Sequence, residues 1–495
     1  MSQPGADLRR RTLRSLYWQL LGVGGQRIVQ LTSQVVLARL LLPEDIGLFV
    51  IVLSGIGVVE SLTLFLGEQA TMSSERAADR HYLDTVFTVR FVRGLLISSL
   101  LCGLAWPLAW YFADGEIETR YWLPGLFLTL AGNGLIDSLQ SPARAARMKG
   151  LEFHRVVAGD FAASVLSLAL TVGLALLWRD VWALLIAHLG GTTIRVAISY
   201  VAAPHRPRLH VERDVFRELM AYGRQSAGTP FLLLMVFCAP AFVLGKLAGM
   251  GAVAVFDFAG RLARLPEDVF LRVLAPVAVP AYAQLRSDLP RLARAWTRAV
   301  HAFLLVGTPM SVALAWCGDA LPSVVFGPKY GSISGLFALL ALHGGLAGLT
   351  AVVGPVFWAV GQPQWDRKAQ FFRCVTIYAL GVPAAIWGGT TAFAAASCVA
   401  IGTALAFSLL HALPILGLRL RDLAQVTRDG IMLGAGLLGA LVVVDLAAAP
   451  TGWWRILASG ALGGPLLAFL LVRILRGRRG APPPDVPMPE FDNAL

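Results

Sequence analysis

Two apolar stretches of this 495-residue chain carry charged or amide side chains at helical spacing. In residues 15–38, Gln26 and Gln30 fall on one face of a helix, with Arg27 and Gln34 on its flank. Amides there hydrogen-bond either to a neighbouring helix or to a ligand in a cavity, and the pattern leaves both interpretations open. An arginine in an apolar segment needs an anion, so we expect Arg27 to line a substrate-binding cavity with the two glutamines.

A second stripe of charge lies in VFDFAGRLARLPEDVFLRVLAP, residues 255–276. Five ionisable side chains there fall within about 80° of arc on a helix, and they can pair four residues apart. They are Asp257, Arg261, Arg264, Asp268 and Arg272. The stripe is either a self-neutralised structural ladder or a site where one arginine binds an anionic substrate, because the guanidinium fork matches phosphate. Pro266 predicts a kink within the stripe.

The elements that position these side chains are predicted membrane helices. Mean hydropathy is +0.67, and only 15% of residues are charged, which is unlike a soluble protein of this length. Apolar runs of about 20 residues, long enough to cross a bilayer, recur throughout the chain. We expect about fourteen spans, near residues 15–38, 46–67, 86–112, 120–140, 156–177, 181–203, 219–246, 251–282, 299–316, 334–359, 371–388, 391–411, 427–448 and 453–473.

Basic residues are distributed unequally over the loops between these spans. With the N-terminus in the cytoplasm, the inside segments hold about 28 of the 42 Lys and Arg residues and the outside segments about 6. This asymmetry follows the positive-inside rule, so both termini are predicted to be cytoplasmic. It also explains the net charge of +12 without nucleic acid as a partner. No cleavable signal peptide is predicted, and the five scattered cysteines indicate neither disulfides nor a metal site.

An internal repeat organises the spans. VLARLLLPEDIGLF, residues 36–49, aligns with VLGKLAGMGAVAVF, residues 243–256, at an offset of 207, and 125–134 aligns with 335–344 at an offset of 210. The repeated unit holds six helices, an even number, so the two copies have the same orientation, as in parallel-repeat transporters. We therefore expect an all-α polytopic membrane protein of two six-helix lobes. The expected segments are a cytoplasmic basic tail (1–14), an N-lobe (15–203), a cytoplasmic linker (204–218), a C-lobe (219–416), two further helices (417–476) and a disordered cytoplasmic tail (477–495).

The arginines within or at the edges of the spans outnumber the acids that could neutralise them. They are Arg27, Arg90, Arg93, Arg195, Arg224, Arg261, Arg264 and Arg272. At a helix centre facing lipid, each would cost about 2.5–3.5 kcal/mol, so we expect most of them to face water or one another. Arg90 and Arg93, near the cytoplasmic end of their helix, either snorkel or point inward. Glu60, Asp257 and Asp268 are candidates for coupling or ion pairing. Asp160 and Asp445 are the other embedded acids, and for these two and Glu60 we favour pairing with a neighbouring arginine.

Four stretches, in this order along the chain, resemble the polysaccharide transporter family. They are VLARLLLPEDIGLF (36–49), YLDTVFTVRFVRGLL (82–96), RMKGLEFHRVVAGDFAASVLSLAL (147–170) and VVFGPKY (324–330). The resemblance covers residues 14 to 430 and implies a flippase in the bacterial inner membrane. Its substrate would be an oligosaccharide linked to undecaprenyl pyrophosphate, moved by alternating access for surface or exopolysaccharide biosynthesis. Other polysaccharide-assembly proteins, contacted through the tail 480–495, are candidate partners.

One departure from the family concerns ion coupling. Many relatives carry an acid shortly before the Gly-Lys or Gly-Arg that ends the seventh helix, but FCAPAFVLGK (237–246) has none. Any coupling would then pass to Glu60 or Asp257.

Three other functions are weighed against the flippase. A cation-coupled multidrug exporter of the same superfamily would need embedded carboxylates, whereas this chain has an arginine surplus. A peptidoglycan-precursor flippase would share the fold. An enzyme acting on the same lipid would need a catalytic constellation, but the eight histidines are isolated and the longest outer loop, 317–334, has none of them. We therefore predict no enzyme activity and no cofactor.

Overall fold

The computed structural model describes most of the chain as helices. The described residues are 22–62 without 23, 71, 74, 76, 79–112, 117–149, 153–271 without 227, 278, 282, 284–330 without 319, and 333–448, 453–462 and 465. Over these residues no strand occurs, which confirms the predicted all-α fold. Seven of their helices are long and apolar enough to cross a membrane. The chain is thus a multi-pass membrane protein, and the number of about fourteen spans stays a prediction.

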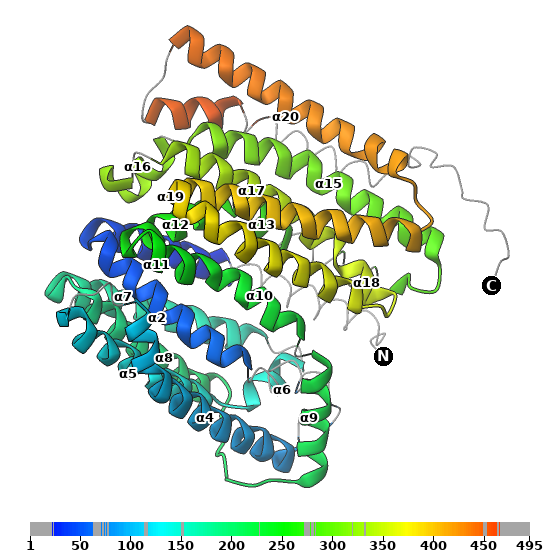
Figure 1. The fold of residues 1–495 in the computed structure, drawn as a ribbon. Helices are drawn as coiled ribbons and strands as arrows, with labels where there is room; N and C mark the ends of the chain where they lie inside the picture. Colours follow the sequence, from blue (N-terminus) through cyan, green and yellow to red (C-terminus); the bar gives the residue numbers. More distant parts are fainter. Residues whose placement is uncertain are drawn as a thin grey trace. The chain divides into compact units, whose positions relative to one another are not determined.

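The chain divides into two compact units, residues 1–254 and 255–495. In the first unit a helix over residues 24–40 is followed by further helices that form its body. These are α2 (Pro43–Leu62), α4 (Arg80–Phe112), α5 (Ile117–Ser138), α6 (Ala143–Lys149), α7 (Phe153–Trp178), α8 (Val181–Ala202), α9 (Arg213–Ser226), α10 (Gly228–Ala239), the π-helix η2 (Pro240–Leu244) and α11 (Gly245–Leu247). Helices α4, α5, α7 and α8 run side by side (Figure 1). The expected division into six-helix lobes stays a prediction.

Two helices that correspond to each other in the sequence repeat touch at their first turns. Helix α12 (Met250–Ala263) begins 207 residues after α2, the offset of the sequence match. A Cβ on Gly47 would lie 1.8 Å from the carbonyl oxygen of Met250, and one on Gly251 would lie 3.2 Å from Oε1 of Glu44. Glu44 and Gly251 are repeat equivalents, so the two copies meet at matching positions. Glycine permits this approach because any larger residue at position 47 would collide with backbone.

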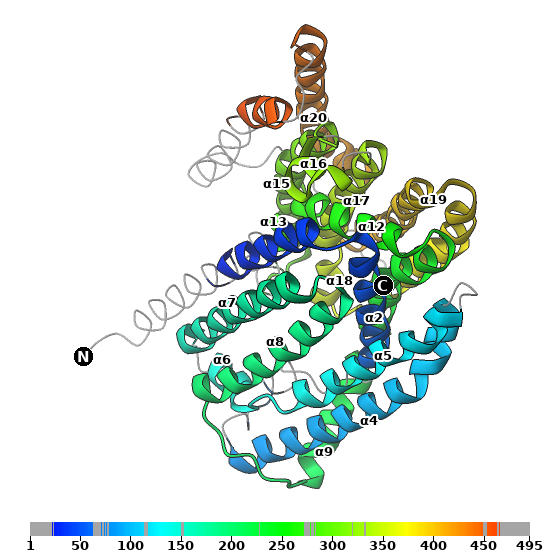
Figure 2. The same ribbon diagram turned by 90° about the vertical axis from the view of Figure 1, so that its left-hand side faces the viewer.

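The expected span at 219–246 is divided, because α9 is a separate helix. Val215 and Leu219 of α9 are buried against Tyr82, Leu83 and neighbouring side chains of α4. The charged side chains at the start of α9, from residue 213 to residue 218, are exposed. In both ribbon views α9 lies across the end of α4 (Figures 1 and 2). An amphipathic helix of this kind buries one stripe on the protein and leaves the other to solvent.

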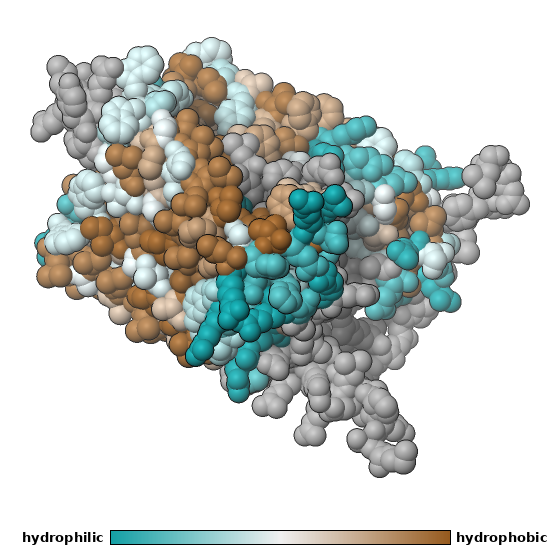
Figure 3. All heavy atoms as spheres, turned by 90° about the horizontal axis from the view of Figure 1, so that it is seen from below, coloured by the Kyte–Doolittle hydropathy of each residue, from teal (hydrophilic) through white to brown (hydrophobic). Residues whose placement is uncertain are grey.

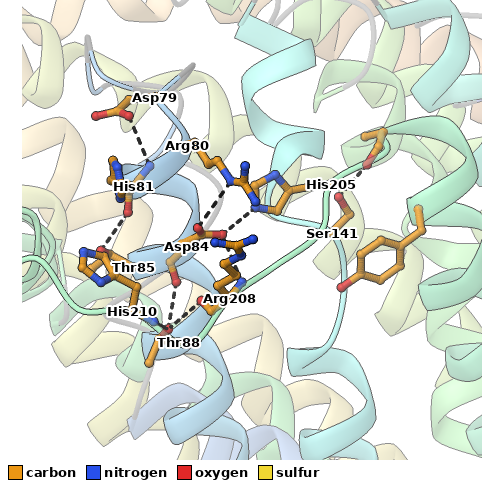
Figure 4. A network of polar contacts seen from close by, with 12 residues as sticks. Asp79, Arg80, His81, Asp84, Thr85, Thr88, Ser141, His205, Arg208 and His210 are labelled. Atoms are coloured by element: carbon orange, nitrogen blue, oxygen red, sulfur yellow. Dashed lines mark hydrogen bonds and ion pairs between the residues drawn. The ribbon is translucent and has the colours of Figure 1, made fainter.

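An extended segment, residues 204–212, leads to α9 and is held by the side chains of α4 (Figure 4). Asp84 Oδ1 accepts from the backbone N–H of Arg208 at 3.1 Å and lies 2.9 Å from Nε2 of His205. Thr88 Oγ1 accepts from the N–H of His210 at 2.9 Å, and Thr85 Oγ1 from the N–H of Glu212 at 3.1 Å. Side chains of α4 thus accept hydrogen bonds from backbone N–H groups of the segment 204–212, as a paired β-strand would do in a sheet.

An ion-pair cluster at the surface reinforces this attachment. The Arg76 guanidinium donates to both carboxylate oxygens of Glu212, at 2.9 and 3.0 Å, and to Asp79 at 3.0 Å. Hydrogen bonds from Arg76 lower the pKa of the Asp79 and Glu212 carboxyls below their ordinary values. The cluster is exposed, so it orients the segment more than it stabilises the fold.

The second unit contains four long helices together with several short ones. They are α13 (Leu265–Val269), α15 (Leu289–Trp316), α16 (Ala320–Phe326), the 3-10 turn η4 (Pro328–Tyr330), α17 (Ser334–Val353), α18 (Pro355–Ala359), α19 (Gln364–Ile415) and α20 (Leu420–Ala448). Of the long helices, α15 packs against α17 and α20, and α17 packs against α19. Helix α19 covers two expected spans, 371–388 and 391–411, and turns back at Gly389, which has φ of 59°. Its two legs meet where Thr403 Oγ1 donates to Thr376 Oγ1 at 3.4 Å. The positive φ explains the glycine at this turn.

The surface has the polarity expected of a membrane protein. Large apolar side chains of α4 are exposed, among them Leu96 at 61%, Trp106 at 62% and Trp110 at 66%. Figure 3 shows hydrophobic side chains over one part of the visible face and hydrophilic ones gathered beside them. Exposed apolar area on this scale would aggregate in water, so these side chains face lipid.

Candidate functional site

The part of the predicted charged stripe from Asp257 to Asp268 lies on α12 and α13 in the second unit. Nε of Arg261 donates to Oδ2 of Asp257 at 2.6 Å, one of the pairs predicted four residues apart. The helix breaks at Arg264, where ψ is 5°, and resumes with Pro266 in the first turn of α13, so the predicted kink is confirmed. Both Arg264 and Asp268 are partly buried.

Two glycines of α17 allow this broken helix to approach closely. A Cβ on Gly344 would lie 2.3 Å from the carbonyl oxygen of Ala263 and 3.3 Å from Cα of Arg264. A Cβ on Gly348 would lie 3.3 Å from Cα of Glu267 and 2.4 Å from Cζ of Phe303. The backbone of α17 thereby fixes the position of Arg264 and of the turn that follows it.

Replacing Gly344 with alanine is therefore expected to displace the break and to lower both the thermal stability and the transport activity. A contact of 2.3 Å with a backbone oxygen cannot be relieved by a side-chain rotation, and overpacking of this kind typically costs about 1–3 kcal/mol. Gly402→Ala in α19 is the matched control, because a Cβ at that position would meet nothing within 4 Å. It should leave the melting temperature unchanged or raise it slightly. Equal melting temperatures for the two purified variants would contradict the close approach.

The amide-bearing helix, residues 24–40, belongs to the first unit and packs on α7 (Figure 2). Nη1 of Arg27 donates to Oε1 of Gln30 at 3.1 Å, so two predicted cavity residues contact each other. Gln26 is partly buried, and Gln30 is exposed. Gln34 is 5% exposed, and neither atom of its amide has a partner among the described residues. A buried amide without a hydrogen-bond partner is costly, so this face is expected to bind a ligand or another polar group.

Arg90 and Arg93 point inward rather than snorkel. Nη2 of Arg90 donates to the backbone oxygen of Asp137 at 3.2 Å and to Gln140 at 3.4 Å. Nη2 of Arg93 donates to the backbone oxygen of Glu60 at 3.2 Å, and its charge also attracts the Glu60 carboxylate. The first unit therefore holds its own cluster of two arginines and two acids from α2, α4 and α5.

Asp160 and Asp445 pair with arginines, as predicted. Asp160 in α7 accepts two hydrogen bonds from the guanidinium of Arg144 in α6, one of them at 2.8 Å. Asp445 in α20 lies 3.6 Å from Nη2 of Arg455. Neither acid is left to carry a proton by itself.

Two predicted arginines cannot be placed. Arg224 lies in α9, but its side chain is outside the described part of the structure, and Arg272 is outside the described residues altogether. Both stay predictions.

The fold brings to Arg264 three residues that the sequence pattern did not single out. Glu267 of α13 attracts both Arg264 and Arg373 of α19, and the two arginines repel each other. His343 of α17 lies within the electrostatic influence of both arginines. Glu267 was overlooked because it lies off the face that carries the stripe. Arg373 lies at the start of the expected span 371–388 and was not among the arginines singled out there. Its side chain is in fact buried, at 7% exposed.

The second unit thus combines a guanidinium-rich stripe with a kinked helix. Arg261, Arg264 and Arg373 carry three positive charges against Asp257, Glu267 and Asp268. Such a set can bind a multivalent anion through forked hydrogen bonds, provided that the anion competes with the carboxylates. No group of three metal-ligating side chains occurs among the described residues.

The family assignment follows from the sequence matched. A family model described as "Polysaccharide biosynthesis protein" matches residues 36–334, which is more than half of the chain. This chain belongs to that family. The match includes the helix pair α2 and α12 and all four stretches that resemble the polysaccharide transporter family, so the predicted relationship is confirmed.

Curated relatives share most of the length of this protein. The Succinoglycan biosynthesis transport protein ExoT of Rhizobium meliloti is 22% identical over 70% of this chain and 69% of its own. The Amylovoran biosynthesis protein AmsL of Erwinia amylovora is 22% identical over 73% of this chain and 92% of its own. Among solved structures, the lipid II flippase MurJ in an inward closed conformation matches with a TM-score of 0.73 at 13% identity, covering 92% of this chain and 98% of that one. The match to MurJ shows that the two chains share a fold.

Proposed function

We propose that this polysaccharide biosynthesis protein is a flippase of the bacterial inner membrane. It moves an oligosaccharide linked to undecaprenyl pyrophosphate from the cytoplasmic to the outer leaflet by alternating access, and the product is used for cell-surface or exopolysaccharide biosynthesis. The family and the names of its relatives support the glycan as cargo. The positive-inside pattern supports cytoplasmic termini.

The observation that carries the proposal is the arginine stripe of α12 in a fold shared with a lipid-linked precursor flippase. A lipid-linked saccharide presents a diphosphate, which carries charge and accepts forked hydrogen bonds. Arg261 and Arg264 are partly buried, and the stripe places them one turn apart. The amide face of residues 24–40, with Gln26, Arg27 and Gln30, supplies hydrogen-bond donors suited to sugar hydroxyls.

Two other cargoes are weighed against this one. A cationic drug would need embedded carboxylates available to bind it, whereas the Asp257 carboxylate pairs with Arg261 at 2.6 Å. A peptidoglycan precursor carries the same diphosphate, so Arg261 and Arg264 would bind it as well. The names of the curated relatives favour the polysaccharide cargo.

The test is the lipid-linked saccharide pool in cells that lack this protein. Deletion should cause lipid-linked units to accumulate on the cytoplasmic side while the surface polymer is lost. Mass spectrometry of the extracted lipid then identifies the glycan, and re-expression of the full chain should restore the polymer. An unchanged pool with intact polymer would contradict the proposal. Accumulation of the peptidoglycan precursor instead would show that this precursor is the cargo.

A further inference from the structure

The extended segment 204–212 uses only one of its two backbone edges to contact α4 (Figure 4). Side chains of α4 accept from three backbone N–H groups spaced two residues apart, those of Arg208, His210 and Glu212. The carbonyl oxygen of Arg208 lies on the same side, 3.5 Å from Oγ1 of Thr88. This spacing is that of a β-strand, in which the backbone groups of successive residues point to opposite edges. The backbone groups of Leu209 and Val211 therefore face away from α4.

The edge that faces away from α4 is open. Neither the N–H nor the C=O of Leu209 or Val211 has a hydrogen-bond partner among the described residues. The side chains of these two residues are 71% and 52% exposed. Pro207 has no N–H, so donors for pairing are confined to the part of the edge that follows it. An exposed β edge of this kind can take an added strand through backbone hydrogen bonds.

The side chains of the segment favour an acidic strand as its partner. Arg206 and Arg208 are exposed, and residues 204–211 contain no acid. Glu212, the next acid along the chain, is already paired with an arginine at 2.9 Å. Because side chains alternate along an extended chain, the two arginines lie on one face of the segment and the two exposed apolar side chains on the other. A strand that alternates carboxylate and apolar side chains would match both faces.

We propose that residues 206–211 are a docking edge, to which an extended acidic segment of a second protein adds as a β-strand. The backbone of the partner bonds to Leu209 and Val211, and its carboxylates pair with Arg206 and Arg208. The hydrogen bonds that attach the segment to α4 are not used in this pairing, so the partner binds without displacing the segment. Because the segment belongs to the predicted cytoplasmic linker, the partner is expected on the cytoplasmic side. This inference goes beyond the proposed function and does not depend on it.

The proposal is tested by fluorescence anisotropy with the purified full-length protein in a neutral detergent. The probe is a fluorescein-labelled peptide of about ten residues in which glutamate and valine alternate. It should bind the wild type, whereas a peptide with lysine in place of glutamate should not. A third peptide keeps the glutamates and carries a methyl group on every backbone nitrogen. It should bind at least about fivefold more weakly than the first, because its backbone can no longer donate.

Leu209→Pro removes one N–H from the open edge and leaves the hydrogen bonds to α4 in place. This variant should bind the glutamate peptide at least about fivefold more weakly, with an unchanged melting temperature. Leu209→Val is the matched control, since it keeps the N–H and should bind as the wild type does. Arg208→Gln should also weaken binding. Arg419→Gln, which removes an exposed arginine of the second unit with the same change in net charge, should not.

Three results would overturn the proposal. The first is that the wild type does not bind the glutamate peptide. The second is that the methylated and unmethylated peptides bind equally well, which would leave only an electrostatic contact of the kind that anionic lipids make. The third is self-association of the wild type that Leu209→Pro abolishes, seen by sedimentation velocity, which would assign the edge to a second copy of this chain. The comparison of peptides uses the wild type alone, so it decides the matter even if Leu209→Pro does not fold.

Discussion

Arg261→Ala is expected to reduce glycan export by about 10- to 100-fold, because a hydrogen bond to a charged group contributes about 1.5–3 kcal/mol. Arg27→Ala should have an effect of the same size for the same reason. Export is measured as surface polymer per amount of membrane-inserted protein, so that a change in abundance does not count as a change in function. Arg217→Ala is the control and should export normally, because this exposed arginine pairs with Asp214 of its own helix and with no other described residue.

The partner of Arg261 allows a sharper version of this experiment. Arg261→Ala leaves the Asp257 carboxylate, whose side chain is 18% exposed, without its ion pair, and this alone can lower the amount of folded protein. The double variant Asp257→Asn with Arg261→Gln removes both charges together. Normal abundance with no export would assign Arg261 to the substrate. Recovery of export in the double variant would show that Arg261 serves only to neutralise Asp257.

Arg144→Met should cause the largest loss of folded protein among single substitutions of the ion pairs. Its guanidinium donates twice to Asp160, and the two side chains are 18% and 22% exposed. Breaking a buried pair on one side typically costs about 3–5 kcal/mol, and we expect about 3 here because both groups keep some exposure. Size-exclusion profiles and melting curves of the detergent-solubilised protein measure the effect.

Asp160→Asn combined with Arg144→Met should recover most of that loss, since no uncompensated charge then remains in the helix pair α6 and α7. Arg455→Met gives a comparison at a more exposed pair, because Asp445 is 44% exposed and should tolerate the loss of its partner better. A double variant less stable than Arg144→Met would contradict this prediction. The two residues would then stabilise the fold through separate contacts and not through their ion pair.

The sequence by itself determined the environment, the class of fold and the family. Apolar runs, the distribution of Lys and Arg and the offset of 207 residues are local or periodic features, and each reports directly on a helix in a bilayer. The same periodicity placed Asp257 and Arg261 on one face, and the pair forms at the predicted spacing. Pro266 predicted the break after Arg264 because proline removes a backbone donor wherever it occurs.

Only the tertiary structure decided which charges meet. Arg144 and Asp160 come from different helices, and the segment 204–212 is held by Asp84, more than a hundred residues earlier. Arg373 was not singled out by its sequence position at the start of an expected span, yet the packing of α19 against α17 buries it. Helical periodicity gives the direction of a side chain from its own axis, but the position of the neighbouring axis depends on contacts such as Gly344 on Ala263. The cost of burying a charge is set by those neighbours, so it is read only from the folded chain.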